Sequence, residues 1–150
     1  DYFLLMYGDN YWPIELKNMC SKYDALGTCM TTTVFSNRNG TGEYGFENNI
    51  VVNNNSIVLG YDKKRSTESA NGVDIGYFLI NREKLDSNMK GNVSFEMDIL
   101  PPIILKNELG AYITNEQYYY ITNYQSLKDF ETAAKINQFL PLNKLFFNNE

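Results

Sequence analysis

The sequence contains no histidine, and this absence excludes several kinds of active site. Ser-His-Asp and Cys-His catalytic systems need an imidazole as their general base. A catalytic zinc site without histidine would have to be built from cysteines and carboxylates alone, which is uncommon. Hard oxygen ligands remain plentiful, so we expect any bound metal to be Mg²⁺.

Positive charge, cysteine and long apolar runs are also scarce. The 150 residues carry 13 Lys and Arg against 18 Asp and Glu, a net charge of −5. With no basic cluster we expect no nucleic-acid partner. With no apolar run near the roughly 18 residues of a membrane span, we expect no membrane partner. Cys20 and Cys29 are interpreted as reduced thiols of a cytoplasmic protein. Because the first residue is Asp1, we expect the chain to start inside a longer or processed protein.

The first part of the chain has the pattern of a strand, a helix and a second strand. Residues 2–7 form an apolar and aromatic run, typical of a strand buried on both faces. Helical apolar spacing then begins at Leu16, and Gly27 is a suitable helix stop. Residues 28–35 are rich in β-branched side chains. This order predicts a βαβ unit whose two strands pair in parallel.

The middle of the chain predicts a hairpin and another buried strand. Residues 50–52 and 57–59 are apolar and flank a polar Asn-rich turn. Residues 73–80 form the next apolar run, and Gly76 in its middle indicates a close approach of a ligand or another backbone. Asn81 is expected to cap a short helix through Leu85.

The last part of the chain predicts two helices and two strands. Ser94 is a suitable cap for a helix that Pro101-Pro102 must kink or split. Residues 111–114 and 118–122 are expected to form a closing pair of strands. Asn123 is expected to cap a last helix, which Pro141 ends. We therefore expect one α/β domain over residues 1–140, a Rossmann-like mixed sheet flanked by helices, followed by a tail over 141–150.

Two carboxylates are the best candidates for chemistry. Asp9 follows an apolar strand, and ligands of open α/β sheets bind beyond the carboxyl ends of strands. It can hold Mg²⁺ against phosphate oxygens, with Gly8 letting the backbone come close, or it can cap the next helix; the spacing leaves both open. Asp74, near Gly76, either contacts a substrate or is an exposed strand residue, and residue type slightly favours the second.

Other polar and aromatic groups have simpler interpretations. Asp62 and Lys63 end a strand and enter a loop, where charges are usually solvated. Glu96 and Asp98 are interpreted as acids that stabilise a helix N-terminus. The Tyr118–Tyr120 run is interpreted as a packed edge strand rather than a stacking platform. These patterns alone predict an α/β domain with one candidate acidic metal site.

Six segments, taken in order, carry more information than any one of them. They are residues 4–10 (strand plus Gly-Asp), 43–45 (Glu-Tyr-Gly), 61–64 (Tyr-Asp-Lys-Lys), 73–77 (Val-Asp-Ile-Gly-Tyr), 94–101 (Ser-Phe-Glu-x-Asp-x-Leu-Pro) and 120–123 (Tyr-Ile-Thr-Asn). Their order and spacing over residues 2–135 resemble the sugar-phosphate nucleotidyltransferases, with most similarity to the sugar-1-phosphate guanylyl- and cytidylyltransferases.

The resemblance implies a fold, a reaction and a set of site residues. The fold is the C-terminal part of a nucleotide-diphospho-sugar transferase. The reaction joins a sugar-1-phosphate to a nucleoside triphosphate, releases pyrophosphate and uses Mg²⁺, as in nucleotide sugar and polysaccharide biosynthesis. Asp9 is then the metal carboxylate, and Lys63 is the second catalytic residue. The implied substrate-binding residues are Gly8, Tyr44, Gly45, Asp62, Asp74 and Gly76.

The sequence also departs from the family pattern. The family's N-terminal Gly-rich loop and Lys-Pro segment are absent, so the chain begins at about the fourth strand of the expected fold. Tyr120 replaces the second metal carboxylate, and Asp74 replaces an Asn. We therefore expect residues 1–150 alone to be inactive and, through an exposed sheet edge, to associate with themselves or with the missing half of the fold. The alternatives are a non-catalytic sugar-phosphate- or nucleotide-binding or regulatory relative and, less favoured, a glycosyltransferase.

Overall fold

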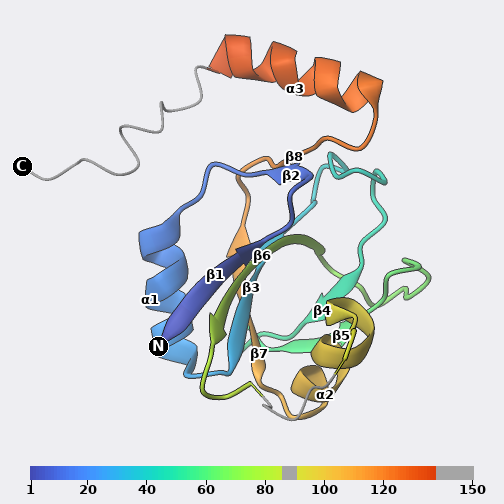
Figure 1. Ribbon diagram of the computed structural model, residues 1–150. Helices are drawn as coiled ribbons and strands as arrows, with labels where there is room; N and C mark the ends of the chain where they lie inside the picture. Colours follow the sequence, from blue (N-terminus) through green and yellow to red (C-terminus); the bar gives the residue numbers. More distant parts are fainter. Residues whose placement is uncertain (86–90, 138–150) are drawn as a thin grey trace, which may run out of the picture.

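A four-stranded mixed sheet forms the centre of the protein (Figure 1). The computed structural model describes residues 1–85 and 91–137. The strand order is β1 (Tyr2–Met6), β6 (Val73–Asn81), β3 (Met30–Phe35) and β7 (Leu109–Thr114). β6 is antiparallel to both of its neighbours, whereas β3 and β7 are parallel. The predicted mixed α/β sheet flanked by helices is confirmed.

The predicted parallel pairing of the first two long strands is wrong. β1 and β3 are joined by helix α1 (Leu16–Leu26) and run in the same direction, but β6 lies between them. Phe78 of β6 pairs with Leu5 on one side and Thr32 on the other. Local spacing predicted the strands but not their neighbour, because β6 comes some forty residues later in the sequence. α1 ends as predicted, with Gly27 in the left-handed region at φ 63°.

Strand β1 is an edge strand, and the prediction that both of its faces are buried is also wrong. The side chains of Tyr2, Phe3 and Met6 are 50%, 42% and 55% exposed. The central strand β6 is the one that fits the prediction, because Ile75 and residues 77–80 are all buried. The apolar run at residues 2–7 therefore belongs to a strand that, within residues 1–85 and 91–137, pairs with β6 alone.

Each face of the sheet has its own core, because side chains alternate along the strands. On one face, α1 packs Met19 and Tyr23 against Tyr77 and Leu79. On the other, a hairpin and helix α2 (Leu100–Leu105) cover Phe78 and its neighbours. Figure 1 shows α1 on one side of the sheet and the hairpin with α2 on the other.

The predicted hairpin is confirmed as β4 (Ile50–Val52) and β5 (Val58–Tyr61). In its turn, Asn53 Oδ1 accepts hydrogen bonds from the backbone N–H groups of Asn55 and Ile57, each at 2.9 Å. This side chain therefore fixes the turn locally, as Asn commonly does.

The segment before β7 is a helix interrupted near its prolines, as predicted. Ser94 caps it, with Oγ accepting from Met97 N at 3.2 Å. A π-helical turn η1 (Phe95–Ile99) comes first, and α2 follows with the two prolines in its first turn, where no N–H donor is needed. The predicted short helix after Asn81 is wrong: the described residues there form a turn on the Asn81 side chain, which accepts from Glu83 N and Lys84 N.

The closing strands pair differently from the prediction. β7 pairs with β3, and β8 (Tyr119–Tyr120) pairs with β2 (Asn10–Tyr11) in a separate small sheet. Tyr118 is buried, which supports the packed interpretation of this aromatic run. Asn123 Oδ1 accepts from Ser126 N at the start of α3 (Tyr124–Asn137), which confirms the predicted cap. Pro141 and the predicted tail lie outside the described residues.

Candidate active site at the open end of the hairpin

Asp74 is held inside the protein at the start of β6. Its Oδ1 accepts hydrogen bonds from Thr32 Oγ1 at 2.6 Å and Gly76 N at 3.2 Å, and its own N–H donates to Asn49 Oδ1 at 2.9 Å. The side chain is half-buried and faces β3, so the exposed-strand alternative is wrong. Burial raises the pKa of Asp74 to about 6, and the nearby charge of Glu96 adds to this rise. The hydrogen bonds that the carboxylate accepts from Thr32 and Gly76 oppose it, because they favour the ionised form.

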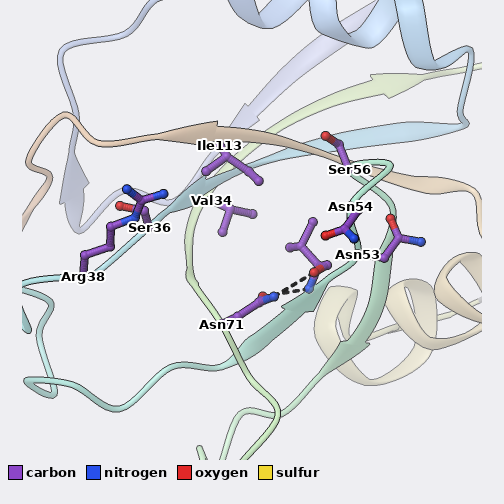
Figure 2. Close-up of a pocket in the computed structure, with 9 residues that line it drawn as sticks. Val34, Ser36, Arg38, Asn53, Asn54, Ser56, Asn71 and Ile113 are labelled. Atoms are coloured by element: carbon purple, nitrogen blue, oxygen red, sulfur yellow. Dashed lines mark hydrogen bonds between the residues drawn. The ribbon is translucent and has the colours of Figure 1, made fainter.

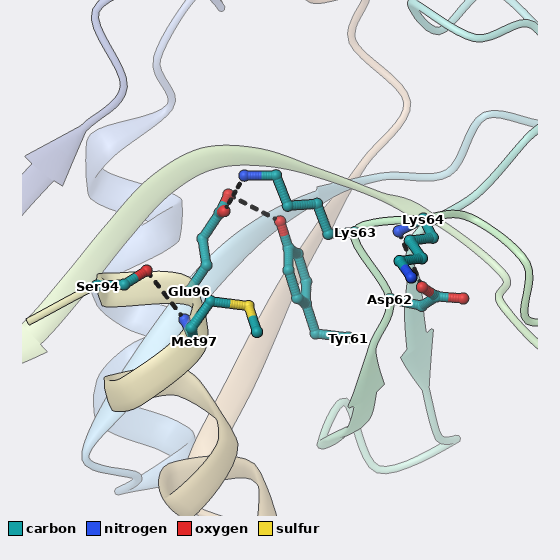
Figure 3. A network of polar contacts seen from close by, with 7 residues as sticks. All are labelled: Tyr61, Asp62, Lys63, Lys64, Ser94, Glu96 and Met97. Atoms are coloured by element: carbon teal, nitrogen blue, oxygen red, sulfur yellow. Dashed lines mark hydrogen bonds and ion pairs between the residues drawn. The ribbon is translucent and has the colours of Figure 1, made fainter.

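Glu96 joins this region from η1, which packs on the same face of the sheet as the hairpin, although it was interpreted only as a helix-terminal acid. Its Oε1 accepts from the Tyr61 hydroxyl at 3.0 Å, and its Oε2 lies 2.5 Å from Lys63 Nζ. Figure 3 shows Tyr61 and Lys63, from the end of β5, meeting Glu96 above η1. This contact raises the pKa of Lys63, because the carboxylate favours the ammonium form.

Tyr7 completes the group. Its hydroxyl oxygen is buried and makes no hydrogen bond to any of the described residues. Burial raises the pKa of Tyr7 well above its usual range, with further contributions from the charges of Asp74, Glu96 and Asp9. The pKa of Tyr61 is raised by burial and by the charges of Asp74 and Glu96. We refer to Tyr7, Tyr61, Asp74 and Glu96 as the acidic cluster.

Gly76 is needed because Tyr7 packs on it. Its φ is +76°, and a Cβ at this position would lie 2.4 to 2.9 Å from Tyr7 side-chain atoms. The predicted close approach exists, and the group that approaches is a tyrosine ring of the same chain. An L side chain would be strained by both the backbone conformation and the contact.

Asp9 and Gly8 lie in an exposed turn between β1 and β2. The turn is anchored, because Ile121 N donates to the Asp9 carbonyl at 2.7 Å and Asn10 Nδ2 donates to Ile75 O at 3.1 Å. The N-cap position of α1 is Glu15, whose side chain makes no capping hydrogen bond, and Asp9 lies six residues before it, so the helix-cap alternative for Asp9 is wrong. Among the described residues, none hydrogen-bonds to the Asp9 carboxylate, which leaves it available to a ligand.

A metal site made by the protein alone is not found in the described part of the chain. No three His, Cys, Asp or Glu residues in that part are arranged to hold a metal ion. Mg²⁺, however, commonly keeps several waters and binds one or two carboxylates together with substrate phosphates. The single exposed carboxylate of Asp9 fits that kind of site. Tyr120, which the resemblance predicts to replace a second carboxylate, pairs with Asn10 beside this turn.

Asp62 organises the loop that follows β5. Its Oδ2 accepts hydrogen bonds from both the backbone N–H and the hydroxyl of Ser66 and of Thr67, at 2.8 to 2.9 Å. Its Oδ1 accepts from Lys64 N. These donors hold the pKa of Asp62 well below its usual range. The carboxylate thus fixes the loop beside Lys63, and its contact with a substrate stays a prediction.

Tyr44 and Gly45 lie in the loop opposite Lys63. The Tyr44 ring is 53% exposed, and the Arg65 guanidinium lies 4.4 Å from its centre, within cation–π range. Gly45 adopts a φ of +60°, and its carbonyl accepts from Asn37 Nδ2 at 2.9 Å. Arg65 also donates to Glu47 O at 2.8 Å and lowers the pKa of Asp74.

The structure brings together Asp74, Gly76 and Lys63, with Tyr44 and Asp9 near them. It adds residues that sequence reasoning missed: Tyr7, Thr32, Tyr61, Arg65 and the true contacts of Glu96. The sequence held one signal that could have pointed to them as site residues: Tyr7, Tyr61 and Glu96 fall inside the family-like segments. As arranged, carboxylates can accept hydrogen bonds from hydroxyl groups, and Lys63 and Arg65 can balance a phosphate.

Comparison with known proteins identifies the fold. Neither a protein-family model nor a curated protein matches the sequence. Among solved structures, HddC from Yersinia pseudotuberculosis matches with a TM-score of 0.65 at 14% identity, covering 85% of this chain and 53% of that one. HddC complexed with GMP-PN gives 0.63 at 13% identity, with coverages of 85% and 53%. A Bacillus anthracis protein assigned as a glucose-1-phosphate thymidylyltransferase, in complex with a sucrose, matches with a TM-score of 0.66 at 14% identity. This match covers 91% of this chain and 55% of that one.

The chain spans about half the length of these structures. In the described residues, no helix combines the length and apolar character needed to cross a membrane. The similarity extends over most of residues 1–150 and agrees with the six family-like segments. The protein therefore shares a mixed α/β fold with about half of each of these structures, one of which is assigned as a glucose-1-phosphate thymidylyltransferase.

Proposed function

We propose that this chain carries the sugar-phosphate side of a nucleotidyltransferase that joins a sugar-1-phosphate to a nucleoside triphosphate and releases pyrophosphate. The observation that carries the proposal is the acidic cluster beside Lys63, with the buried and unpaired Tyr7 hydroxyl within it. Buried polar groups normally have partners. A bound sugar offers hydroxyl groups that pair with this hydroxyl and with the carboxylates.

The phosphate of the substrate fits the cations around the cluster. Lys63 is 68% exposed while remaining paired with Glu96, so its ammonium group is accessible to an anion. Arg65 lies over Tyr44 on the same side. Two cations offset the negative charge that Asp74 and Glu96 would otherwise place next to an anionic substrate.

Asp9 is proposed to hold Mg²⁺ together with phosphate oxygens and water. Bound there, Mg²⁺ would neutralise charge on the phosphates during transfer. The exposed carboxylate and the anchored turn support this role.

The process we propose is nucleotide sugar formation for polysaccharide synthesis. Cys20 and Cys29 are free thiols, which supports a cytoplasmic location for it.

Pyrophosphate release tests the proposal. The intact gene product is incubated with Mg²⁺, each nucleoside triphosphate and a panel of hexose 1-phosphates. We expect turnover with at least one pair of substrates. In the Asp9→Asn variant we expect the rate of turnover to fall by a factor of about 10²–10³. Asp24→Asn, at an exposed position on α1, is the matched control and should retain activity. A folded protein without turnover on any pair would contradict the proposal.

A second candidate is a sugar-phosphate- or nucleotide-binding or regulatory relative without catalysis. It is favoured by the absence of a three-ligand metal cluster in the described residues and by Tyr120 in β8. Calorimetry separates the two functions. Hexose 1-phosphate binding that is independent of Mg²⁺, in a protein without turnover, would favour the binding protein.

A further inference from the structure

A cavity lies at the turn end of the hairpin (Figure 2), and its lining residue Val34 on β3 pairs with Asp74 of the acidic cluster on β6. Its volume is about 380 Å³, within the usual range for small-molecule sites. It opens between the carboxyl ends of β3 and β7 and the turn that joins β4 to β5. None of the four residues of the acidic cluster lines it.

The floor of the cavity is aliphatic. Val34 and Val52 are buried there, while Ile113, on the edge strand β7, stays 50% exposed. Figure 2 shows Val34 and Ile113 between the polar groups at the two ends. Such a floor suits the carbon face of a small ring or chain, because covering Ile113 removes apolar area from water.

One end of the cavity presents a cation. Arg38 is exposed, and its guanidinium has no hydrogen bond or ion pair with the described residues. Its backbone is nevertheless held in place, because the neighbouring Asn37 is buried and holds the loop. Asn37 Nδ2 donates to Gly45 O at 2.9 Å and to Asn48 Oδ1 at 3.0 Å, and its Oδ1 accepts from Gly42 N.

The opposite end presents uncommitted polar groups. Within the described structure, neither the Asn54 amide group nor the Ser56 hydroxyl makes a hydrogen bond, whereas their backbone is fixed by Asn53 and by Ala111 N, which donates to Ser56 O at 2.8 Å. Ser56 adopts a φ of +61°, an uncommon conformation that tends to occur at functional positions.

The other polar lining groups already have partners. Ser36 Oγ donates to Asn115 Oδ1, and the Asn71 amide pairs with both backbone groups of Val52, as the dashed lines in Figure 2 show. The groups left for a ligand are therefore a guanidinium at one end and an amide and a hydroxyl at the other.

From this arrangement we infer that the cavity binds a small polyhydroxylated organic anion. Its phosphate or carboxylate lies on Arg38, whose planar fork matches either group. Its hydroxyl groups lie against Asn54 and Ser56, and its carbon skeleton covers Val34 and Ile113. This inference does not depend on the proposed transferase activity, because no residue of the acidic cluster lines the cavity.

Amide NMR titrations of the intact gene product test the inference. The probes are ribose 5-phosphate and gluconate, which distinguish a phosphate from a carboxylate, and uncharged ribose. We expect saturable shifts at residues 53–57 and at Arg38 with at least one anion, a Kd of about 1 mM or tighter, and much smaller shifts with ribose.

Two arginine variants make the test specific. Arg38→Gln should weaken binding about tenfold or more, as expected when a charge-assisted hydrogen bond is lost. Arg82→Gln removes another exposed arginine, beyond the far end of β6, and should leave binding unchanged. Arg38 is on the surface, so unfolding of this variant is not expected, and its amide spectrum verifies that.

Several results would overturn the inference. These are an absence of shifts at residues 53–57, equal binding by ribose, and binding that survives Arg38→Gln. Shifts confined to the surroundings of Tyr61 and Lys63 would also overturn it, because the anion would then bind at the acidic cluster instead.

Discussion

The two ends of the β4–β5 hairpin lie over the same face of the sheet but carry different chemistry. At the open end, the carboxylates of Asp74 and Glu96 lie near the cations Lys63 and Arg65. At the turn end, Arg38 is the charged group that lines the cavity. One hairpin thus lies between a site that combines carboxylates with cations and a site that presents a single cation.

The difference shows how each end acquires its charge. The acidic end is assembled from distant segments, since Glu96 meets Lys63 across 33 positions and Thr32 meets Asp74 across 42. At the turn end, Asn53 fixes the turn locally, although the cavity also takes lining residues from β3, from Asn71 and from β7. We expect the acidic end to be the more sensitive to single changes.

The largest expected effect on stability comes from Gly76→Ala, which disturbs the acidic end. The new Cβ would meet the Tyr7 ring and would require a left-handed backbone conformation for alanine. The free energy of unfolding should fall by about 3 kcal/mol or more, measured by urea denaturation.

Gly60→Ala is the matched control in a neighbouring strand. There the nearest atom is 3.6 Å from the added Cβ, and φ is not positive. We expect a change within about 1 kcal/mol. Equal losses in the two variants would mean that the contact between Tyr7 and Gly76 does not shape this end.

The next largest effect is a pH-dependent gain in Asp74→Asn. The native pKa of about 6 lies above the ordinary value of 3.8, so the folded protein holds the Asp74 proton more tightly than the unfolded chain does. Asp74 therefore favours folding below about pH 4, and this contribution is lost as the pH rises through 6. The variant should be more stable than the wild type by about 2–3 kcal/mol at pH 8, and the difference should decrease toward pH 4.

Thermal unfolding across this pH range measures the gain, with Asp24→Asn on α1 as a surface control. A difference between Asp74→Asn and the wild type that does not change with pH would contradict the burial of an ionised carboxylate at this position.

A smaller effect is expected from Glu96→Gln. The substitution removes the carboxylate that raises the pKa of Lys63, so that pKa should fall, and the pKa of Asp74 should fall with it. The stability cost should be about 1 kcal/mol or less, because Lys63 is largely exposed. NMR titration of the lysine and aspartate side chains measures both pKa values.

Glu131→Gln breaks a comparable surface pair with Lys128 on α3 and is the control. It should leave the pKa values of Lys63 and Asp74 unchanged. If Glu96→Gln has no more effect on them than this control, the acidic cluster is not electrically coupled.

How much of this could be predicted from the sequence differs between the two ends. The Asn-rich turn, the Asn123 cap and the Gly27 stop act within a few residues, so local patterns predicted them correctly. The pairing of β1 with β6 and the packing of Tyr7 on Gly76 join segments far apart, and no local pattern encodes them.

The candidate site illustrates the same limit. Lys63, Asp74 and Gly76 were named from the family-like segments, and the structure brings them to one end of the hairpin. Glu96 was assigned to its own helix because an acid near a helix N-terminus already has a sufficient local explanation. Its contact with Lys63 depends on where η1 lies relative to β5, which only the tertiary fold determines.

The most direct test of the account is the affinity of hexose 1-phosphates for three forms of the intact gene product, measured by calorimetry with Mg²⁺. We predict that Lys63→Gln weakens the tightest binding step of the best hexose 1-phosphate about tenfold or more, whereas Arg38→Gln, which acts on the second site at the turn end, leaves that tightest step within about twofold of wild type. The reverse pattern, or equal affinity in all three forms, would contradict the assignment of the acidic cluster as the sugar-phosphate site.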